Sequence, residues 1–311
     1  MSGETIFVAL QQFCENDELP RKELLQAGFR IQQNSFGRRL HREEMAELLR
    51  EADAVLAGVE PYDAQILDSL PRLRCISRCG VGTDSIDLET ARRRGIAILT
   101  TQDEVVEPVA QMSLAMILAL ARNFPLHWSD FHGGEWKKYT GHLLSEWTVG
   151  LVGYGRIGQA LHHYLQPFGC RILVCDPNLP KEQIPKGAQC TDLHSLLRES
   201  DIVSLHATLP TGHPPLLGRQ ELALMRKGSR LVNTARGSLV EEGALVEALE
   251  TGHLEGAALD VFEMEPYAGK LSRLPQVLCT PHVASLTSRS RARMELKCAR
   301  NVVEFFDQGS Q

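Results

Sequence analysis

The stretch Trp147-Thr148-Val149-Gly150-Leu151-Val152-Gly153-Tyr154-Gly155-Arg156-Ile157-Gly158-Gln159-Ala160 decides the fold. An apolar run ends at Val152, and glycines follow at 153, 155 and 158 in the spacing G-x-G-x-x-G. Such glycines permit a tight turn, a close approach of the backbone to a pyrophosphate, and close packing of a helix on a strand. The stretch therefore predicts a strand, a phosphate-binding turn and a helix whose N-terminus faces the phosphates.

An acidic residue follows the next apolar run. Asp176 directly follows the apolar segment 171–175. It lies about 20 residues beyond the glycines, at the position where a carboxylate that binds the ribose hydroxyls is expected. Such a carboxylate repels a 2′-phosphate, so Asp176 favours NAD over NADP. A glycine turn in an ordinary α/β unit is the alternative, and the position of Asp176 argues against it.

Composition limits the class of protein. The chain has 311 residues, of which 43% are hydrophobic and 23% charged, with a net charge of −6. This favours a globular protein of two domains and gives no sign of a nucleic-acid partner. The longest apolar run, 114–121, is too short to span a membrane. Eight scattered cysteines without a C-x-x-C pair, and an N-terminus unlike a signal peptide, predict a cytoplasmic protein without metal ligands.

Strands and helices alternate along most of the chain. In the first hundred residues we expect strands at 5–10, 29–31, 54–57, 74–78 and 96–99, with helices at 20–27, 42–51, 62–69 and 88–94. Beyond the glycine-rich stretch we expect strands at 202–205, 229–233, 257–259 and 277–279, and helices at 218–226, 241–250 and 288–306. This alternation predicts two parallel-sheet α/β domains, with the last helix returning to the first.

The middle segment differs from both sheets. A helix at 108–122 is so continuously apolar that we expect it to be buried between domains or against a second subunit. The segment 123–147 reads as an irregular arm that carries Trp128, Trp136 and Trp147. Tryptophans in such an arm suggest an interface, and filling of the core is an equal alternative. We expect a symmetric homodimer built on residues 108–147.

Three chemically distinctive residues follow strands of the second half. Arg236 follows one strand, Glu265 belongs to an acidic segment that begins at Asp260, and His282 follows a third strand. Each has a plain alternative: a surface arginine, a solvated acid and a loop histidine. Ligands of open parallel sheets bind beyond the carboxyl ends of the strands, so the combination favours a site.

These motifs, with 77–82 (Ser-Arg-Cys-Gly-Val-Gly), resemble the D-isomer-specific 2-hydroxyacid dehydrogenases, including the short phosphoglycerate dehydrogenases. The resemblance covers nearly the whole chain. It implies a flavodoxin-like substrate domain at 1–103 and 289–311, and an NAD-binding Rossmann domain at 104–288. It implies hydride transfer between NAD and a small, anionic 2-hydroxy or 2-oxo acid.

The resemblance also implies roles for residues. Arg236, Glu265 and His282 would be catalytic: the histidine moves the proton, the glutamate orients it and favours its charged form, and the arginine binds the substrate carboxylate. Val81 and Gly82 would offer N–H groups to that carboxylate, and Asp260 would hold the nicotinamide amide. The residues assigned to the cofactor are Gly153, Tyr154, Gly155, Arg156, Ile157, Gly158, Asp176, His206, Thr234, Ala235 and Asp260.

Arg78 raises the question of substrate charge. A second anionic group would suit this arginine, which makes 3-phosphoglycerate the first candidate; an ion pair with Asp84 or Asp87 is an equal alternative. Two other functions stay open. One is an NAD-sensing binding protein of the corepressor type on the same scaffold, and the other is a phosphite-type dehydrogenase.

Overall fold

The computed structural model describes residues 3–180, 186–210 and 212–308. The chain forms two compact units: unit 1 comprises Met1–Val105 and Leu286–Gln311, and unit 2 comprises Val106–Ser285. Residues 1–2 and 309–311, the ends of the predicted substrate domain, lie outside the described residues.

Unit 1 is built on a five-stranded parallel sheet with the order β2-β1-β3-β4-β5. Its strands are β1 Thr5–Val8, β2 Arg30–Gln33, β3 Ala54–Ala57, β4 Cys75–Arg78 and β5 Ala97–Thr100. Every residue of β1 and β3 is buried, as expected for central strands covered on both faces. This is the flavodoxin-like order, in which ligand sites form beyond the carboxyl ends of the strands.

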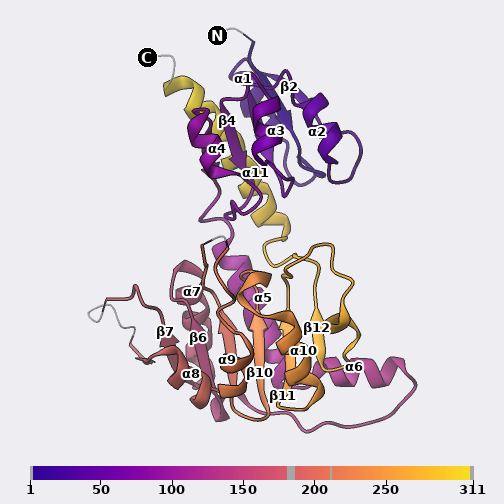
Figure 1. Ribbon diagram of the computed structural model, residues 1–311, viewed down its shortest axis with the longest axis vertical. Helices are drawn as coiled ribbons and strands as arrows, with labels where there is room; N and C mark the ends of the chain where they lie inside the picture. Colours follow the sequence, from indigo (N-terminus) through magenta and orange to yellow (C-terminus); the bar gives the residue numbers. More distant parts are fainter. Residues whose placement is uncertain (1–2, 181–185, 211, 309–311) are drawn as a thin grey trace. The chain divides into compact units, whose positions relative to one another are not determined.

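The helices of unit 1 include one from the far end of the chain. They are α1 Leu19–Gln26, α2 Arg42–Leu48, α3 Ala64–Ser69, α4 Leu88–Arg93 and α11 Ser288–Gln308. The helix α11 packs against α1 and against β3, β4 and β5 (Figure 1). Its Phe306 ring lies 5.4 Å from the ring of Phe29, and its Cys298 thiol donates to the Ser77 carbonyl at 3.0 Å.

Unit 2 is built on a seven-stranded parallel sheet with the order β12-β11-β10-β9-β6-β7-β8 (Figure 1). Its strands are β6 Thr148–Val152, β7 Arg171–Cys175, β8 Ala188–Cys190, β9 Ile202–Leu205, β10 Ser229–Asn233, β11 Leu254–Leu259 and β12 Val277–Cys279. The order reverses between β6 and β9, which is the Rossmann arrangement with its ligand crevice at that reversal. The prediction of two Rossmann-like parallel sheets is confirmed.

Helices cover both faces of this sheet. They are α5 Val106–Ala121, α6 Phe124–His132, α7 Arg156–Leu165, α8 Leu193–Glu199, α9 Arg219–Leu224 and α10 Glu242–Glu250. One core lies under α5 and α7, and the other lies under α8, α9 and α10. The buried residues of α5 therefore pack on α7, β10 and β11 within unit 2. The expectation that this face is covered by another domain or subunit was wrong, because a central Rossmann helix is apolar for the same reason.

The segment 123–147 is more regular than predicted. Residues 124–132 form α6, which starts where Asn123 adopts a left-handed φ of 51° and Pro125 stands in the first turn. Proline is compatible with that position, so it begins the helix instead of breaking it. Trp147 is buried in the core under α5 and α7, whereas Trp128 and Trp136 are 70% and 81% exposed. The sequence analysis also omitted β8 and α8.

Within the described residues, no single helix is long and apolar enough to cross a membrane. The helices α5 and α6 satisfy that test only when they are taken together, as a pair bent by 67°.

Arg230 on β10 links the bend between α5 and α6 to the sheet. This residue is 3% exposed, and its Nη2 donates to Asn123 Oδ1 at 3.2 Å and lies 2.7 Å from Glu255 Oε2. Its guanidinium carbon stands 4.8 Å from the centre of the Trp147 ring. Burial lowers the pKa of Arg230, and the charge of Glu255 opposes that shift. The guanidinium of Arg230 therefore contacts Asn123 at the bend, Glu255 on the neighbouring strand β11 and the ring of Trp147.

We expect Arg230→Ala to lower the free energy of unfolding of unit 2 by about 2–3 kcal/mol. The change removes the hydrogen-bond donor of Asn123 Oδ1 and leaves a cavity beside the Trp147 ring. Urea unfolding followed by tryptophan fluorescence measures this, since all three tryptophans lie in unit 2. Arg226→Ala is the matched control: its pair with Asp201 at 2.6 Å is half exposed and should contribute less than about 1 kcal/mol. Equal losses for the two variants would contradict the assignment.

Candidate active site

The glycine-rich turn follows β6 and leads directly into α7. Gly153 has φ +91°, and a Cβ there would lie 2.6 Å from the backbone of His206 and Ala207. A Cβ at Gly158 would lie 2.5 Å from the Gly153 carbonyl oxygen. Gly155, the N-cap of α7, has open space around it. The first and third glycines therefore close the turn, and the second leaves the helix N-terminus accessible, which fits a bound pyrophosphate.

Asp176 stands at the end of β7, beside this turn. Its Oδ2 accepts a hydrogen bond from Tyr154 N at 2.7 Å, and its Oδ1 accepts one from Asn178 N at 2.8 Å. Two backbone donors thus fix the orientation of the carboxylate, and each oxygen keeps a lone pair for a further donor. The assignment of Asp176 to the ribose hydroxyls stays a prediction, and the geometry is compatible with it.

The strands β9 and β10 contribute the next predicted cofactor residues. The imidazole of His206 contacts Ser204 Oγ at 2.9 Å, and burial lowers the pKa of His206 to about 4, so the ring is neutral at physiological pH. Thr234 is buried, and its hydroxyl lies 2.8 Å from the hydroxyl of Ser113 on α5. Ser113, which the sequence analysis did not single out, therefore fixes the rotamer of a residue at this edge.

Arg236 lies in the loop after β10, close to the loop after β11. The loop is shaped by Asn233, whose Oδ1 accepts from Ala235 N at 3.0 Å and whose Nδ2 donates to the Arg236 carbonyl at 2.8 Å. A Cβ at Gly237 would lie 2.0 Å from the Phe262 carbonyl carbon. Only glycine permits this contact, which brings the loop of Arg236 against the loop that carries Glu265.

Asp260 anchors the loop after β12. The residue is fully buried; its Oδ1 accepts from Thr280 Oγ1 at 2.5 Å and Val283 N at 2.9 Å, and its Oδ2 accepts from Ala284 N at 2.8 Å. Its carbonyl accepts from His282 N at 2.9 Å. The predicted contact of Asp260 with the nicotinamide amide is untested, and its carboxylate already holds the loop of His282.

His282 and Glu265, two of the three predicted catalytic residues, form an ion-pair geometry. The His282 Nδ1 lies 2.8 Å from Glu265 Oε2, while Glu265 Oε1 accepts from Phe262 N at 3.0 Å. The side chains are 43% and 34% exposed. His282 has φ 54°, an uncommon backbone conformation for a residue with a side chain. With Nδ1 engaged, Nε2 is the nitrogen left for proton transfer.

The predicted substrate residues of unit 1 lie after β4. Gly80 has φ +143°, its N–H donates to Thr101 Oγ1 at 2.8 Å, and its carbonyl accepts from Thr101 N. These bonds hold the turn and leave Val81 exposed and Gly82 partly exposed. The Nη1 of Arg78 donates to the Cys79 carbonyl. Asp87, one suggested partner of Arg78, caps α4 by accepting from Thr90 N at 2.9 Å.

Glu60, in the loop after the neighbouring strand β3, was missed by the sequence analysis. It is 2% exposed, and its Oε2 accepts from Gly58 N at 2.8 Å. Burial raises the pKa of Glu60, whereas the positive charges of Arg39 and Arg78 act to lower it. The signal in the sequence was an acid in the segment 58–61 (Gly-Val-Glu-Pro), which follows the buried strand β3.

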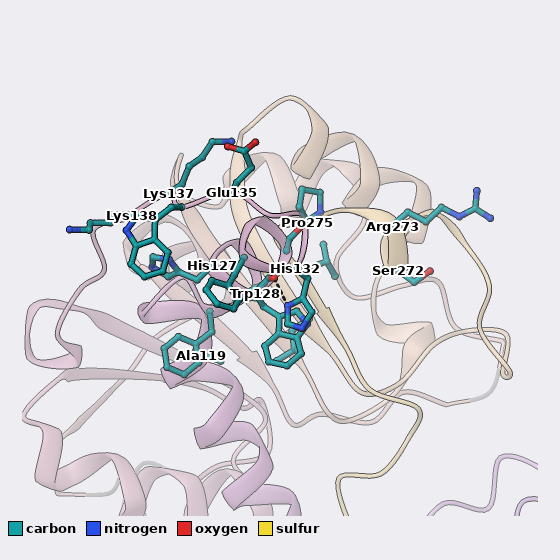
Figure 2. Close-up of a pocket in the computed structure, with 17 residues that line it drawn as sticks. Ala119, His127, Trp128, His132, Glu135, Lys137, Lys138, Ser272, Arg273 and Pro275 are labelled. Atoms are coloured by element: carbon teal, nitrogen blue, oxygen red, sulfur yellow. Dashed lines mark hydrogen bonds between the residues drawn. The ribbon is translucent and has the colours of Figure 1, made fainter.

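A separate cavity of about 940 Å³ lies around α6. Figure 2 shows Trp128 beside His132 in this cavity, with ring centroids 4.2 Å apart. Its aromatic lining comes from Phe124, Trp128, Phe131 and Trp136, and no predicted site residue lines it.

Comparisons with known proteins agree with this arrangement. The family model for the NAD-binding domain of D-isomer specific 2-hydroxyacid dehydrogenases matches residues 114–284. A glyoxylate reductase from Thermococcus litoralis is 37% identical over 273 residues, which is 84% of this chain and 82% of that protein. A D-3-phosphoglycerate dehydrogenase from Methanocaldococcus jannaschii is 36% identical over 258 residues, 81% of this chain and 49% of the other.

A solved structure extends the likeness to the whole chain. The D-lactate dehydrogenase of Aquifex aeolicus, complexed with NAD and lactic acid, has a TM-score of 0.83 and 28% identity, covering 98% of this chain and 96% of that one. NAD binding therefore belongs to the fold and to the family. The chain is an NAD-dependent member of the D-isomer specific 2-hydroxyacid dehydrogenases.

Proposed function

We propose that this protein reduces a small, singly charged 2-oxo acid, with glyoxylate as the first candidate. The observation that carries the proposal is the His282–Glu265 pair at 2.8 Å, at the carboxyl edge of the NAD-binding sheet and on loops adjoining that of Arg236. The glyoxylate reductase relatives support the choice of substrate. Unit 1 serves as the substrate domain and unit 2 as the cofactor domain.

The residues divide the chemistry as follows. Bound NADH supplies the hydride that reaches C2 of the acid. Nε2 of a protonated His282 gives its proton to the carbonyl oxygen, so that the C=O bond becomes C–OH; in the oxidation the same nitrogen takes the proton back. Glu265 stabilises the imidazolium, and Arg236 binds the substrate carboxylate with its forked, permanently charged guanidinium. Val81 and Gly82 add backbone donors.

The corepressor-type and phosphite-type alternatives gain no support from the three relatives described above, which are a glyoxylate reductase, a D-3-phosphoglycerate dehydrogenase and a D-lactate dehydrogenase. A direct assay separates the three functions. We expect oxidation of NADH with glyoxylate and no reduction of NAD with phosphite, both measured by the absorbance of NADH. Cofactor binding without turnover of any 2-oxo acid would overturn the proposal.

We expect His282→Ala to reduce kcat by about 10²–10⁴-fold while the Kd for NADH stays nearly the same, because the histidine acts on the proton and not on the cofactor. Glu265→Gln should keep part of the activity, because an amide holds the imidazole with a weaker hydrogen bond than a carboxylate does. Stopped-flow reduction and NADH titration measure these effects.

Glu263→Gln is the control for Glu265→Gln, because Glu263 is an exposed acid of the same loop. An unchanged kcat in Glu265→Gln, or an equal loss in Glu263→Gln, would remove the proposed pairing.

The charge near Arg78 argues for a singly charged substrate. An arginine with a free choice of anion would suit 3-phosphoglycerate, but the buried carboxylate of Glu60 lies within electrostatic range of both Arg78 and Arg39. Its negative charge offsets part of their attraction for a second anionic group on the substrate. A phosphate would therefore gain less here than the sequence alone suggests.

We expect Glu60→Gln to raise kcat/KM for 3-phosphohydroxypyruvate relative to glyoxylate by about threefold or more, because it removes one negative charge from the neighbourhood of Arg78 and Arg39. Arg78→Ala should lower the same ratio through the KM of the phosphorylated acid. Exposed Glu43→Gln on α2 is the matched control. If neither Glu60→Gln nor Arg78→Ala changes the ratio of the two kcat/KM values, both residues have structural roles only, and the proposal of charge selection at this loop is wrong.

We also propose a cytoplasmic homodimer in which the α6 cavity receives a second copy. The exposed rings of Phe124, Trp128, Phe131 and Trp136 form an apolar surface around a cavity of about 940 Å³. Such a surface rarely stays uncovered on a monomer. A two-fold arrangement would bury the same surface on both copies.

Sedimentation equilibrium at micromolar concentration should give a dimeric mass, and Trp128→Glu should yield a monomer because it places a charge in the apolar surface. Leu25→Glu, an exposed leucine on α1 of unit 1, should stay dimeric. A monomeric wild type would reject the proposal.

A further inference from the structure

A buried hydrogen bond connects the dinucleotide turn to the middle of α7. The Tyr154 hydroxyl lies 2.6 Å from His162 Nδ1, and the two residues are 7% and 3% exposed. Tyr154 is the residue between the first two glycines of the turn, and His162 lies on the buried face of α7. His162 belongs to no motif and has no role in the proposed reaction.

Tyr154 is held at three points. Its N–H donates to Asp176 Oδ2 at 2.7 Å, its carbonyl accepts from Gln159 Nε2 at 3.1 Å, and its hydroxyl meets His162. The first bond orients the carboxylate assigned to the ribose, and the second ties the turn to the first turns of α7. The side chain of Tyr154 therefore couples the position of the glycine turn, the direction of Asp176 and the body of the helix.

His162 is costly as a packing residue. Burial lowers the pKa of His162, and among the described residues its Nε2 has no hydrogen-bond partner although it is buried. An unpaired buried polar atom destabilises the fold, and leucine or phenylalanine would fill the space without that cost. The polar contact that His162 does make is the one with Tyr154, which gives the histidine a reason to be there.

We propose that His162 is a positioning residue for NAD: through the Tyr154 hydroxyl it holds the glycine turn and Asp176 in the binding conformation, without touching the cofactor. The bond acts on dinucleotide affinity and leaves proton transfer at His282 unchanged. Its loss lets the phenol ring move and loosens the N–H that orients Asp176. One hydrogen bond of this kind corresponds to roughly a 3- to 10-fold change in Kd.

The test compares three replacements of His162. The amide of Asn occupies nearly the place of Nδ1, so His162→Asn should restore the contact; the amide of Gln lies nearer to the place of Nε2 and should not. We expect His162→Leu and His162→Gln to raise the Kd for NADH by about 3- to 10-fold, and His162→Asn to stay near the wild type. NADH fluorescence gives the Kd, and kcat at saturating NADH should be unchanged.

Three further variants make the test specific. Tyr154→Phe should raise the Kd as His162→Leu does, and the double variant should be no worse than either one, because both remove the same bond. His163→Leu, at the exposed neighbouring position of α7, should leave the Kd unchanged. An unchanged Kd in His162→Leu overturns the inference, as does an effect of His162→Asn equal to that of His162→Leu. Since binding is measured without substrate, the result stands apart from the proposed reaction.

Discussion

The buried carboxylate of Asp260 fixes the loop on which the proposed proton transfer depends. Three donors converge on it, from the side chain of Thr280 and from the N–H groups of Val283 and Ala284. Its own N–H donates to the Asn233 carbonyl, so the ends of β10, β11 and β12 are joined through one residue. A charge that is fully buried is tolerated only when it is satisfied in this way. The left-handed backbone of His282 persists because the surrounding bonds determine it.

A second carboxylate, at the end of β7, holds its neighbouring loops in the same way. Asp176, like Asp260, stands at the carboxyl end of a parallel strand and accepts backbone N–H groups, here from Tyr154 in the turn after β6 and from Asn178 in the turn after β7. A carboxylate at such an edge accepts hydrogen bonds from the backbone of the loops, and its remaining lone pairs can accept hydrogen bonds from a ligand. Rigid loops result without any change in the sheet, which lets the family vary its substrate by varying the loops. The proposed bond between Tyr154 and His162 extends this support into α7.

Much of this fold was predictable because its signals are local. The glycine spacing and the apolar runs around it located β6, α7 and β7, and the alternation of strands and helices gave both parallel sheets. Elements with short or ambiguous sequence patterns were not predicted. The strand β8 has only three residues, and Pro125 reads equally well as a loop residue or as the first turn of α6. The prediction that α5 is buried against another domain or subunit was wrong, because an apolar pattern shows that a helix face is buried but does not show which element buries it.

The candidate site shows a different limit, which concerns charge. From the sequence, Arg78 counts as a full positive charge beside the Val81–Gly82 turn, and a phosphate on the substrate and an ion pair with Asp84 or Asp87 are equal alternatives for its partner. In the fold, the adjacent strand β3 delivers Glu60 to the same edge through the register that pairs Ala57 with Arg78. Glu60 is 2% exposed, so water screens its charge poorly and its effect on Arg78 is stronger than that of an exposed acid. Residues 18 positions apart in sequence thus lie at the same edge of the sheet, and the proposed charge selection depends on both.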